Sequence, residues 1–143
     1  MLVGNIAISI LVGLTFIYGG LINLNLLPIF PLALLATLSN LGRELYKTIE
    51  DVLGDKKVGV KTFAIRYGIF KTRALASVLI IIAVALSIVP VILQIFGLSY
   101  IILVAIADIA FLAAIVSKPN ASFLCKIAMI LALLAFFAGA VFK

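Results

Sequence analysis

Long apolar stretches alternate with short polar breaks along this chain, and one polar stretch is much longer than the rest. Each apolar stretch is close to the length of about 20 residues that an α-helix needs to cross the hydrocarbon core of a bilayer. We therefore expect an all-α integral membrane protein with five transmembrane helices, which form a single transmembrane domain over residues 1–143. The expected spans are 2–22, 29–48, 74–95, 98–116 and 122–142.

Composition supports the same class. Hydrophobic residues make up 66% of the chain and charged residues 11%, whereas an ordinary soluble domain is about half apolar and about a quarter charged. The chain has no histidine, which excludes imidazole catalysis and histidine metal sites. Its single cysteine, Cys125, excludes an internal disulfide framework.

The charges are concentrated in one segment, residues 43–73, which holds eight of the 11 lysines and arginines and four of the 5 acids. Basic links between spans favour the cytoplasmic side of a membrane. We therefore expect a multi-pass protein of the cell membrane whose charged segment and active face are cytoplasmic. The net charge of +6 then reflects topology and attraction to anionic lipid headgroups, and no nucleic-acid partner is expected.

Five polar residues at the end of the second span share one helical face. Their spacings are four, four, three and four, which places side chains above one another on an α-helix. The last two, Asp51 and Asp55, could converge on one divalent cation, because Mg²⁺ is commonly held by one or two carboxylates together with substrate phosphate oxygens. The full set is Asn40, Glu44, Thr48, Asp51 and Asp55.

Cationic side chains follow this face and could donate hydrogen bonds to phosphate oxygens. They are Lys56, Lys57, Lys61 and Arg66. A second interpretation treats the whole segment as a solvated loop in which the acids pair with the lysines. Spacing alone leaves both interpretations open, because D-x-x-x-D is common on helices and a metal site normally has more than two ligands.

The run ELYKTIEDVLGDKKVGVKTFAIRYG resembles the second aspartate-rich motif of the UbiA superfamily of intramembrane prenyltransferases. Its pattern R-E-x-x-K-x-I-E-D-x-x-G-D-x-x-x-G-V-K-T is most similar to that of the archaeal digeranylgeranylglyceryl phosphate synthases. The resemblance covers essentially the whole chain, but only the C-terminal half of the family's helical bundle. The expected fold is therefore half of a UbiA-like bundle.

The resemblance implies magnesium-dependent transfer of a prenyl group from geranylgeranyl diphosphate to a geranylgeranylglyceryl phosphate acceptor, with quinone or porphyrin-type acceptors as the alternative within the class. Asp51 and Asp55 would be the catalytic and metal-binding residues. The apolar spans would hold the prenyl tail. The residues expected to contact substrate are Asn40, Glu44, Lys47, Lys61 and Arg66.

The chain also departs from the family pattern. The first aspartate-rich motif is absent, and no acid precedes Glu44. Thr48 and Leu53 stand where many relatives have acids, and Phe63-Ala64 replaces a frequent Leu-Pro. We therefore expect a fragment or split half that needs an N-terminal half or another protomer. The alternative is a non-catalytic membrane scaffold or a transporter-like subunit.

Asp108 is an acid near the middle of the fourth expected span, where ionisable groups are rare and usually face the interior of a bundle. Three roles remain open for it: pairing with Lys126 of the next span, contact with substrate, or a neutral acid. Lys126 could instead extend to the interface. Pro90 is expected to kink the third span, because proline removes a helical hydrogen bond.

Overall fold

The computed structural model describes residues 2–22 and 28–142, and its regular elements there are all helices. The prediction of an all-α fold is confirmed for this part of the chain. The helices are α1 (Leu2–Ile22), α2 (Ile29–Glu50), α3 (Val52–Lys57), α4 (Phe63–Tyr67), α5 (Ile69–Leu86), α6 (Val89–Ile92), α7 (Leu98–Val116) and α8 (Ala121–Val141).

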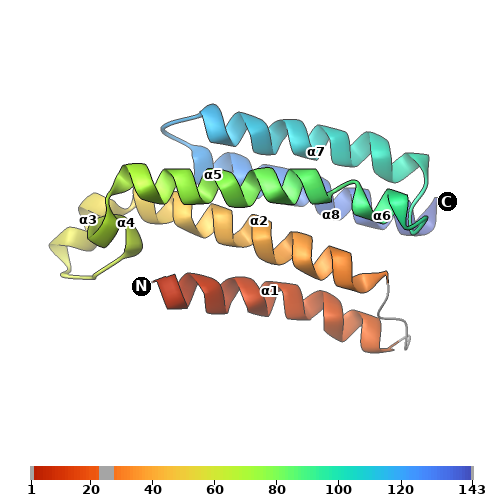
Figure 1. The fold of residues 1–143 in the computed structure, drawn as a ribbon, viewed down its shortest axis with the longest axis horizontal. Helices are drawn as coiled ribbons and strands as arrows, with labels where there is room; N and C mark the ends of the chain where they lie inside the picture. The colour runs from red at the N-terminus through yellow and green to blue at the C-terminus, as the bar shows by residue number, and fades with distance from the viewer. Residues whose placement is uncertain (1, 23–27, 143) are drawn as a thin grey trace.

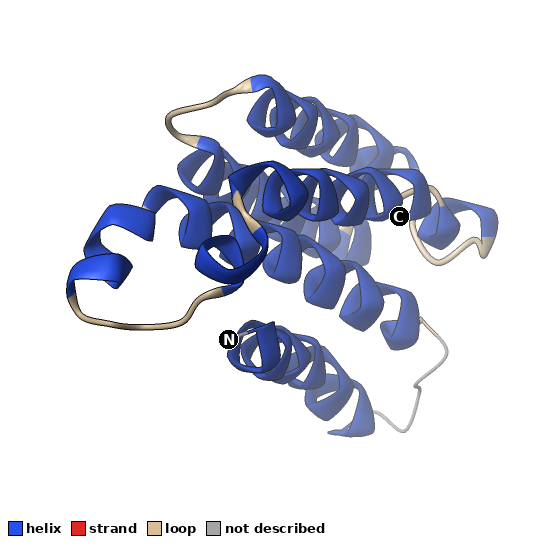
Figure 2. Cartoon of the chain, turned by 60° about the vertical axis from the view of Figure 1, so that its left-hand side comes forward, coloured by secondary structure: helices blue, strands red, loops and turns tan. Residues whose placement is uncertain are grey.

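The long helices run side by side, and α2 is the central one. It packs against α1, α5 and α8, while α7 packs mainly against α8. Figures 1 and 2 show α1 at one edge of the bundle, and the short helices α3 and α4 at one end of it. The N-terminal end of α1 lies at this same end, so the chain's charged segment sits beside its first residues (Figure 1).

The predicted count of five membrane-spanning helices is not matched. Within the described residues, four helical stretches are long and apolar enough to cross a membrane: Leu2–Ile22, Ile69–Ile92, Leu98–Val116 and Ala121–Val141. The remaining long helix, α2, has 22 residues but carries charged residues in its last turns. Its length would suffice for a crossing, and the charges near its end lower its hydropathy.

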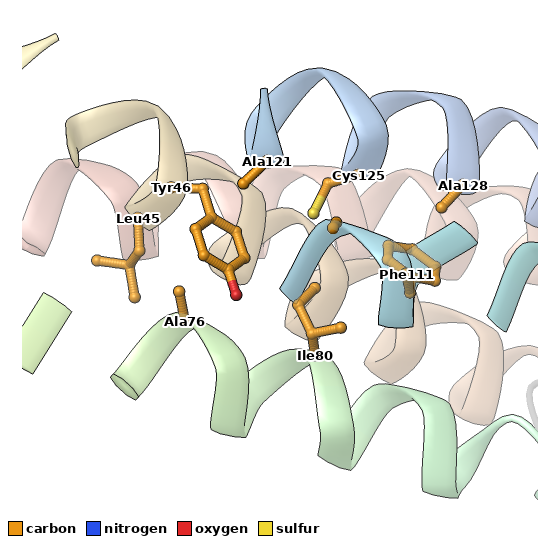
Figure 3. Close-up of a cluster of buried hydrophobic side chains, with 9 residues drawn as sticks. Leu45, Tyr46, Ala76, Ile80, Phe111, Ala121, Cys125 and Ala128 are labelled. Atoms are coloured by element: carbon orange, nitrogen blue, oxygen red, sulfur yellow. The ribbon is translucent and has the colours of Figure 1, made fainter. Parts of the chain in front are cut away.

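Small residues let the helices approach closely around the end of α2. Leu45 and Tyr46 of α2 are 0% and 1% exposed, and they pack in the cluster drawn in Figure 3. Alanines and Cys125 supply much of that cluster from α5, α7 and α8, as is common where helices meet in membranes. The buried residues of the cluster are Leu45, Tyr46, Ala76, Ile80, Phe111, Ala114, Ala121, Cys125 and Ala128.

The third expected span is interrupted next to Pro90, as predicted. Helix α5 ends at Leu86, and α6 begins at Val89. Because the backbone N–H of Val91 bonds to the carbonyl of Ile88, the carbonyl of Ser87 is free to accept a hydrogen bond from the Tyr100 hydroxyl (2.7 Å). The break is therefore stabilised from α7.

The hydrogen-bond partner of Asp108 also lies at this break. The Ser87 hydroxyl donates to Oδ2 of Asp108 at 2.7 Å. Lys126 is exposed, and the ion pair found in the described part of the chain joins Arg43 and Glu44. The pairing with Lys126 that the sequence allowed is therefore not what the structure has, since Asp108 instead links α7 to the break between α5 and α6.

Candidate functional site

The charged residues gather at one end of the bundle. They lie on the last turns of α2, on and between α3 and α4, on the first turns of α5 and around the connection between α7 and α8. Figure 1 shows these parts together at the end of the molecule where α3 and α4 lie. Asp108, in the middle of α7, is the exception among the residues that the structure describes.

Asp51 and Asp55 lie on successive turns of a nearly continuous helical path. Asp51 separates α2 from α3, yet its backbone angles are helical, with φ −87° and ψ −1°. Its N–H donates to the carbonyl of Lys47 at 2.9 Å, and the N–H of Asp55 donates to the carbonyl of Asp51 at 2.9 Å. Asp51 is exposed and Asp55 half-buried. The predicted one-turn spacing of the two carboxylates is therefore present.

The earlier part of the predicted polar face is directed toward α1. Asn40 is buried, and its Nδ2 donates to the Ser9 hydroxyl at 3.1 Å. Two turns later, Asn5 Nδ2 donates to the Thr48 hydroxyl at 3.2 Å. Polar residues of α1 and α2 thus hold the two helices together, a contribution of about 1 kcal/mol for each such hydrogen bond between membrane helices.

Glu44 and Lys47 differ in their surroundings. One oxygen of Glu44 accepts a hydrogen bond from Nη1 of Arg43 at 2.5 Å, so this acid already has a cationic partner. Lys47 is exposed and lies one helical turn before Asp51. The side chains of Lys47 and Asp51 therefore lie on the same side of the helix, one turn apart.

Lys61 and Arg66 line one groove at the charged end. The groove has a volume of about 660 Å³ and lies between the first residues of α1 and the α4 region. Thr62 also lines it, and its buried hydroxyl has no hydrogen-bond partner in the described structure. The groove is lined by Leu2, Val3, Lys61, Thr62, Phe63, Ile65, Arg66 and Tyr67. Two cations and an unpaired hydroxyl suit an anionic group.

Asp51 and Asp55 are not among the residues that line this groove. The structure therefore places the two acids on successive turns of the α2–α3 path and, separately, the two cations in the groove. Both pairs lie within the same charged end, because α3 and α4 are in contact with each other and with α2.

A second cavity, of about 250 Å³, opens between the long helices. Its walls come from α1, α2, α5, α7 and α8, together with Ser87 at the α5–α6 break. Aromatic rings of Phe16, Tyr100 and Phe136 form part of the wall, and polar atoms reach it from Thr15 and Asp108, among others. Such a mainly apolar chamber is suited to hydrocarbon rather than to a charged ligand.

The described residues contain no group of three or more His, Cys, Asp or Glu side chains that could hold a metal ion. Asp51 and Asp55 remain as a pair. Two carboxylates fit Mg²⁺ when substrate phosphates and water complete its shell, which is its usual mode of binding in phosphate chemistry. The donor set therefore suits an ion shared with a phosphorylated substrate better than a permanently bound one.

Glu50 and Arg73 make structural contacts at this end that the sequence patterns did not indicate. Glu50 accepts hydrogen bonds from the backbone N–H and the hydroxyl of Ser122. Arg73 donates to the carbonyls of Ser117 (3.2 Å) and Lys118 (3.3 Å). These partners are 72, 44 and 45 residues away along the chain, so no local pattern could have indicated them.

Comparison with known proteins gives concordant matches. The sequence profile of the UbiA prenyltransferase family matches residues 1–123. The chain is 43% identical to the digeranylgeranylglyceryl phosphate synthase of Methanocaldococcus jannaschii, over 97% of this chain and 52% of the relative. It is 40% identical to the enzyme of that name from Methanosarcina mazei, over 96% of this chain and 50% of the relative.

A solved structure matches as well, with a TM-score of 0.89 and 42% identity, over 97% of this chain and 53% of the other. That structure is described as "Structural and mechanistic insights into the biosynthesis of Digeranylgeranylglyceryl phosphate synthase in membranes". The chain thus spans about half the length of the relatives it matches. With four apolar helices among its described residues it is a multi-pass membrane protein, and it belongs to the UbiA prenyltransferase family.

Proposed function

We propose that this chain takes part in magnesium-dependent transfer of a geranylgeranyl group from its diphosphate to a geranylgeranylglyceryl phosphate acceptor. The observation that carries the proposal is the position of Asp51 and Asp55 on successive helical turns at the charged end of the bundle. The relatives at 40% identity and above that are named digeranylgeranylglyceryl phosphate synthase support this choice of donor and acceptor.

Asp51 and Asp55 would hold Mg²⁺ together with phosphate oxygens of the donor. When bound, the ion would stabilise the negative charge that develops on the departing diphosphate. Lys61 and Arg66, which share one groove, would donate hydrogen bonds to phosphate oxygens. Lys47, one turn before Asp51, would add a further positive charge beside the carboxylates. These residues supply charge-assisted hydrogen bonds, which are stronger than neutral ones.

The remaining predicted substrate residues would act through α2. Asn40 binds Ser9 of α1 and Glu44 binds Arg43, so their side chains would hold α2 in place rather than carry charge to the diphosphate. The apolar cavity of about 250 Å³ would hold part of the prenyl chain. Exclusion of water there would protect the activated prenyl carbon from hydrolysis.

We further propose that the complete site draws ligands from outside residues 1–143. The chain has 5 acids, and three of them have partners: Glu44 with Arg43, Glu50 with Ser122 and Asp108 with Ser87. Only Asp51 and Asp55 are left for metal among the acids that the structure describes. An N-terminal half carrying the family's other aspartate-rich motif, or a second protomer, would supply the missing carboxylates.

The charged end would face the cytoplasm at the cell membrane. Its lysines and arginines are the topological signal for this orientation. Helix α2 would then be a fifth membrane segment, with its apolar first half in the bilayer and its charged last turns at the cytoplasmic surface. The contacts of α2 with α1, α5 and α8 would shield its polar groups from lipid.

A non-catalytic scaffold or transporter-like subunit is the second candidate. The observation in its favour is the lack of a three-residue metal cluster among the described residues. In that role the charged end would bind a partner or anionic lipid, and the loss of Asp51 and Asp55 would not affect prenyl transfer.

The test is prenyl transfer from labelled geranylgeranyl diphosphate by the chain in lipid nanodiscs. It is measured with the chain alone and with a co-expressed polypeptide that carries the family's first aspartate-rich motif. We expect transfer that requires Mg²⁺ and falls at least about 100-fold in the Asp51→Asn/Asp55→Asn double variant. Mutation of residues that only hydrogen-bond to metal ligands already lowers activity by about 10–100-fold. Transfer that survives the double variant would refute the catalytic role, and no transfer in either arrangement would favour the scaffold.

A further inference from the structure

The connection between α7 and α8 is held from two sides at the charged end. It runs from the end of α7 at Val116 to the start of α8 at Ala121. Arg73, in the first turns of α5, donates to two carbonyls on the α7 side of this connection. Glu50, the last residue of α2, accepts two hydrogen bonds on the α8 side. The same short connection therefore anchors both α2 and α5.

Both contacts follow the electrostatics of helix ends. The C-terminal end of a helix carries partial negative charge and the N-terminal end partial positive charge. Arg73 places a cation at the end of α7, and Glu50 places an acid at the start of α8. Asn120 stands at the N-cap position of α8 but makes no capping hydrogen bond through its side chain, so Glu50 supplies from α2 the acceptor that α8 otherwise lacks.

Glu50 uses both carboxylate oxygens in this contact. Oε1 accepts the Ser122 N–H at 2.9 Å, and Oε2 accepts the Ser122 hydroxyl. Two bonds to one residue restrict the rotation of the Glu50 side chain and of the helical turn that bears it. The next residue along the chain is Asp51, whose N–H continues the helical hydrogen bonding to Lys47.

We infer that Glu50 is a positioning residue: through Ser122 it fixes the last turn of α2 and thereby the direction of the carboxylates of Asp51 and Asp55. The inference rests on the proposed function, in which those two residues hold Mg²⁺ with a diphosphate. Glu50 is assigned to Ser122 rather than to the ion, because each of its oxygens already accepts a hydrogen bond from that residue.

Replacing Glu50 by Gln or by Ala distinguishes a positioning role of the side chain from a role of its negative charge. In Glu50→Gln, the amide oxygen still accepts the Ser122 N–H, and the amide N–H donates to the Ser122 hydroxyl, so the attachment persists without the negative charge. Glu50→Ala removes the attachment altogether. A direct metal ligand would be lost equally in both variants, whereas a positioning residue is rescued by Gln. Asn120→Ala, on the same connection, is the matched control, since its side chain makes no capping bond.

Two measurements on the full chain in nanodiscs test the inference. The first is hydrogen–deuterium exchange of the backbone amides of residues 51–57, without metal. The second is Mn²⁺ binding followed by electron paramagnetic resonance, with inorganic pyrophosphate present. We expect faster exchange in Glu50→Ala and an Mn²⁺ dissociation constant raised about 10-fold, at the low end of the effect of groups that orient metal ligands. Glu50→Gln should stay within about 3-fold of the wild type, and Asn120→Ala should match the wild type.

Each contrary result has a distinct meaning. Unchanged exchange in Glu50→Ala would overturn the positioning role whatever the metal does. Faster exchange with unchanged Mn²⁺ affinity would also overturn it, because the junction would then be held without consequence for the ion. An equal loss of affinity in the Gln and Ala variants would make Glu50 a ligand instead. If the wild type binds no Mn²⁺, the proposed metal function fails and the positioning role fails with it, whereas the first two results leave that function intact.

Discussion

Acids occur in two different settings in this protein: the middle of the bundle and its charged end. In the middle, Asp108 accepts a hydrogen bond from Ser87 at the break between α5 and α6. At the charged end, the side chains of Asp51 and Asp55 make no hydrogen bond or ion pair within the described residues. Asp108 thus has a structural partner, although it also lines the apolar cavity, whereas Asp51 and Asp55 have none among the described residues. The acids that remain free for a ligand are the better candidates.

Besides the loss of Asp51 and Asp55, the largest effect is expected from the cations of the groove at the charged end. Removing both in Lys61→Ala/Arg66→Ala should raise the apparent KM for the prenyl diphosphate by about 100-fold or more, because each lost hydrogen bond to a charged group contributes about 1.5–3 kcal/mol. Steady-state kinetics of prenyl transfer provide the measurement.

The matched control for that pair is Lys71→Ala/Lys118→Ala, which removes the same net charge from exposed positions outside the groove. An equal rise in KM in both double variants would show that general positive charge, and not the groove, attracts the substrate. The contrast between the groove and its surroundings would then disappear.

The next effect concerns the middle of the bundle. Asp108→Ala should lower the free energy of unfolding by about 1 kcal/mol, the size of hydrogen bonds between membrane helices. The loss is modest because the Ser87 hydroxyl still has the Val84 carbonyl at 2.7 Å. Reversible unfolding in mixed micelles measures it, with Ile109→Ala as the control, since Ile109 is 67% exposed on the same helix.

If Asp108→Ala instead left stability unchanged and abolished prenyl transfer, the distinction drawn here would be wrong. Asp108 would then act in prenyl transfer, and its hydrogen bond with Ser87 would not contribute to the stability of the fold.

A smaller effect is expected at Arg73. Arg73→Lys should cost about 0.5–1 kcal/mol in the free energy of unfolding, because lysine lacks the planar fork that reaches two carbonyls and stacks less well on an aromatic ring. The guanidinium of Arg73 lies 5.7 Å from the centre of the Tyr46 ring. The same unfolding assay measures the change, and a stability equal to that of the wild type would show that the Arg73 contacts add nothing.

Sequence patterns predicted what depends on neighbouring residues. The helical character of the apolar stretches and the one-turn spacing of Asp51 and Asp55 follow from local periodicity. The break near Pro90 follows from the chemistry of proline. These features need no knowledge of which helices lie side by side, and for that reason they could be read from the chain alone.

Features that depend on distant partners could not be predicted. Asn40 and Thr48 lie on the expected face of α2, but that face meets Ser9 and Asn5 of α1. Likewise, the partner of Asp108 is Ser87 of the preceding helix break rather than Lys126. A helical pattern predicts on which side of its helix a side chain lies. It does not predict which other helix that side contacts.

The expected five spans differ for another reason from the four helices that are apolar enough to cross a membrane within the described residues. The second expected span, 29–48, includes the charged last turns of α2, where the helix continues but the hydropathy falls. Helix length and membrane depth are separate properties, because a helix can leave the bilayer without ending. The expected span 29–48 therefore overlaps the charged segment 43–73, in which α2 continues beyond its apolar half.

The central claim is that Asp51 and Asp55 together bind a divalent cation that is shared with a diphosphate. The most direct test is Mn²⁺ binding to the chain in nanodiscs, followed by electron paramagnetic resonance with inorganic pyrophosphate present. We predict that Asp51→Asn/Asp55→Asn abolishes the bound Mn²⁺ signal while Asp108→Asn leaves it unchanged. Retention of the signal in the double variant, or its loss in Asp108→Asn alone, would contradict the account.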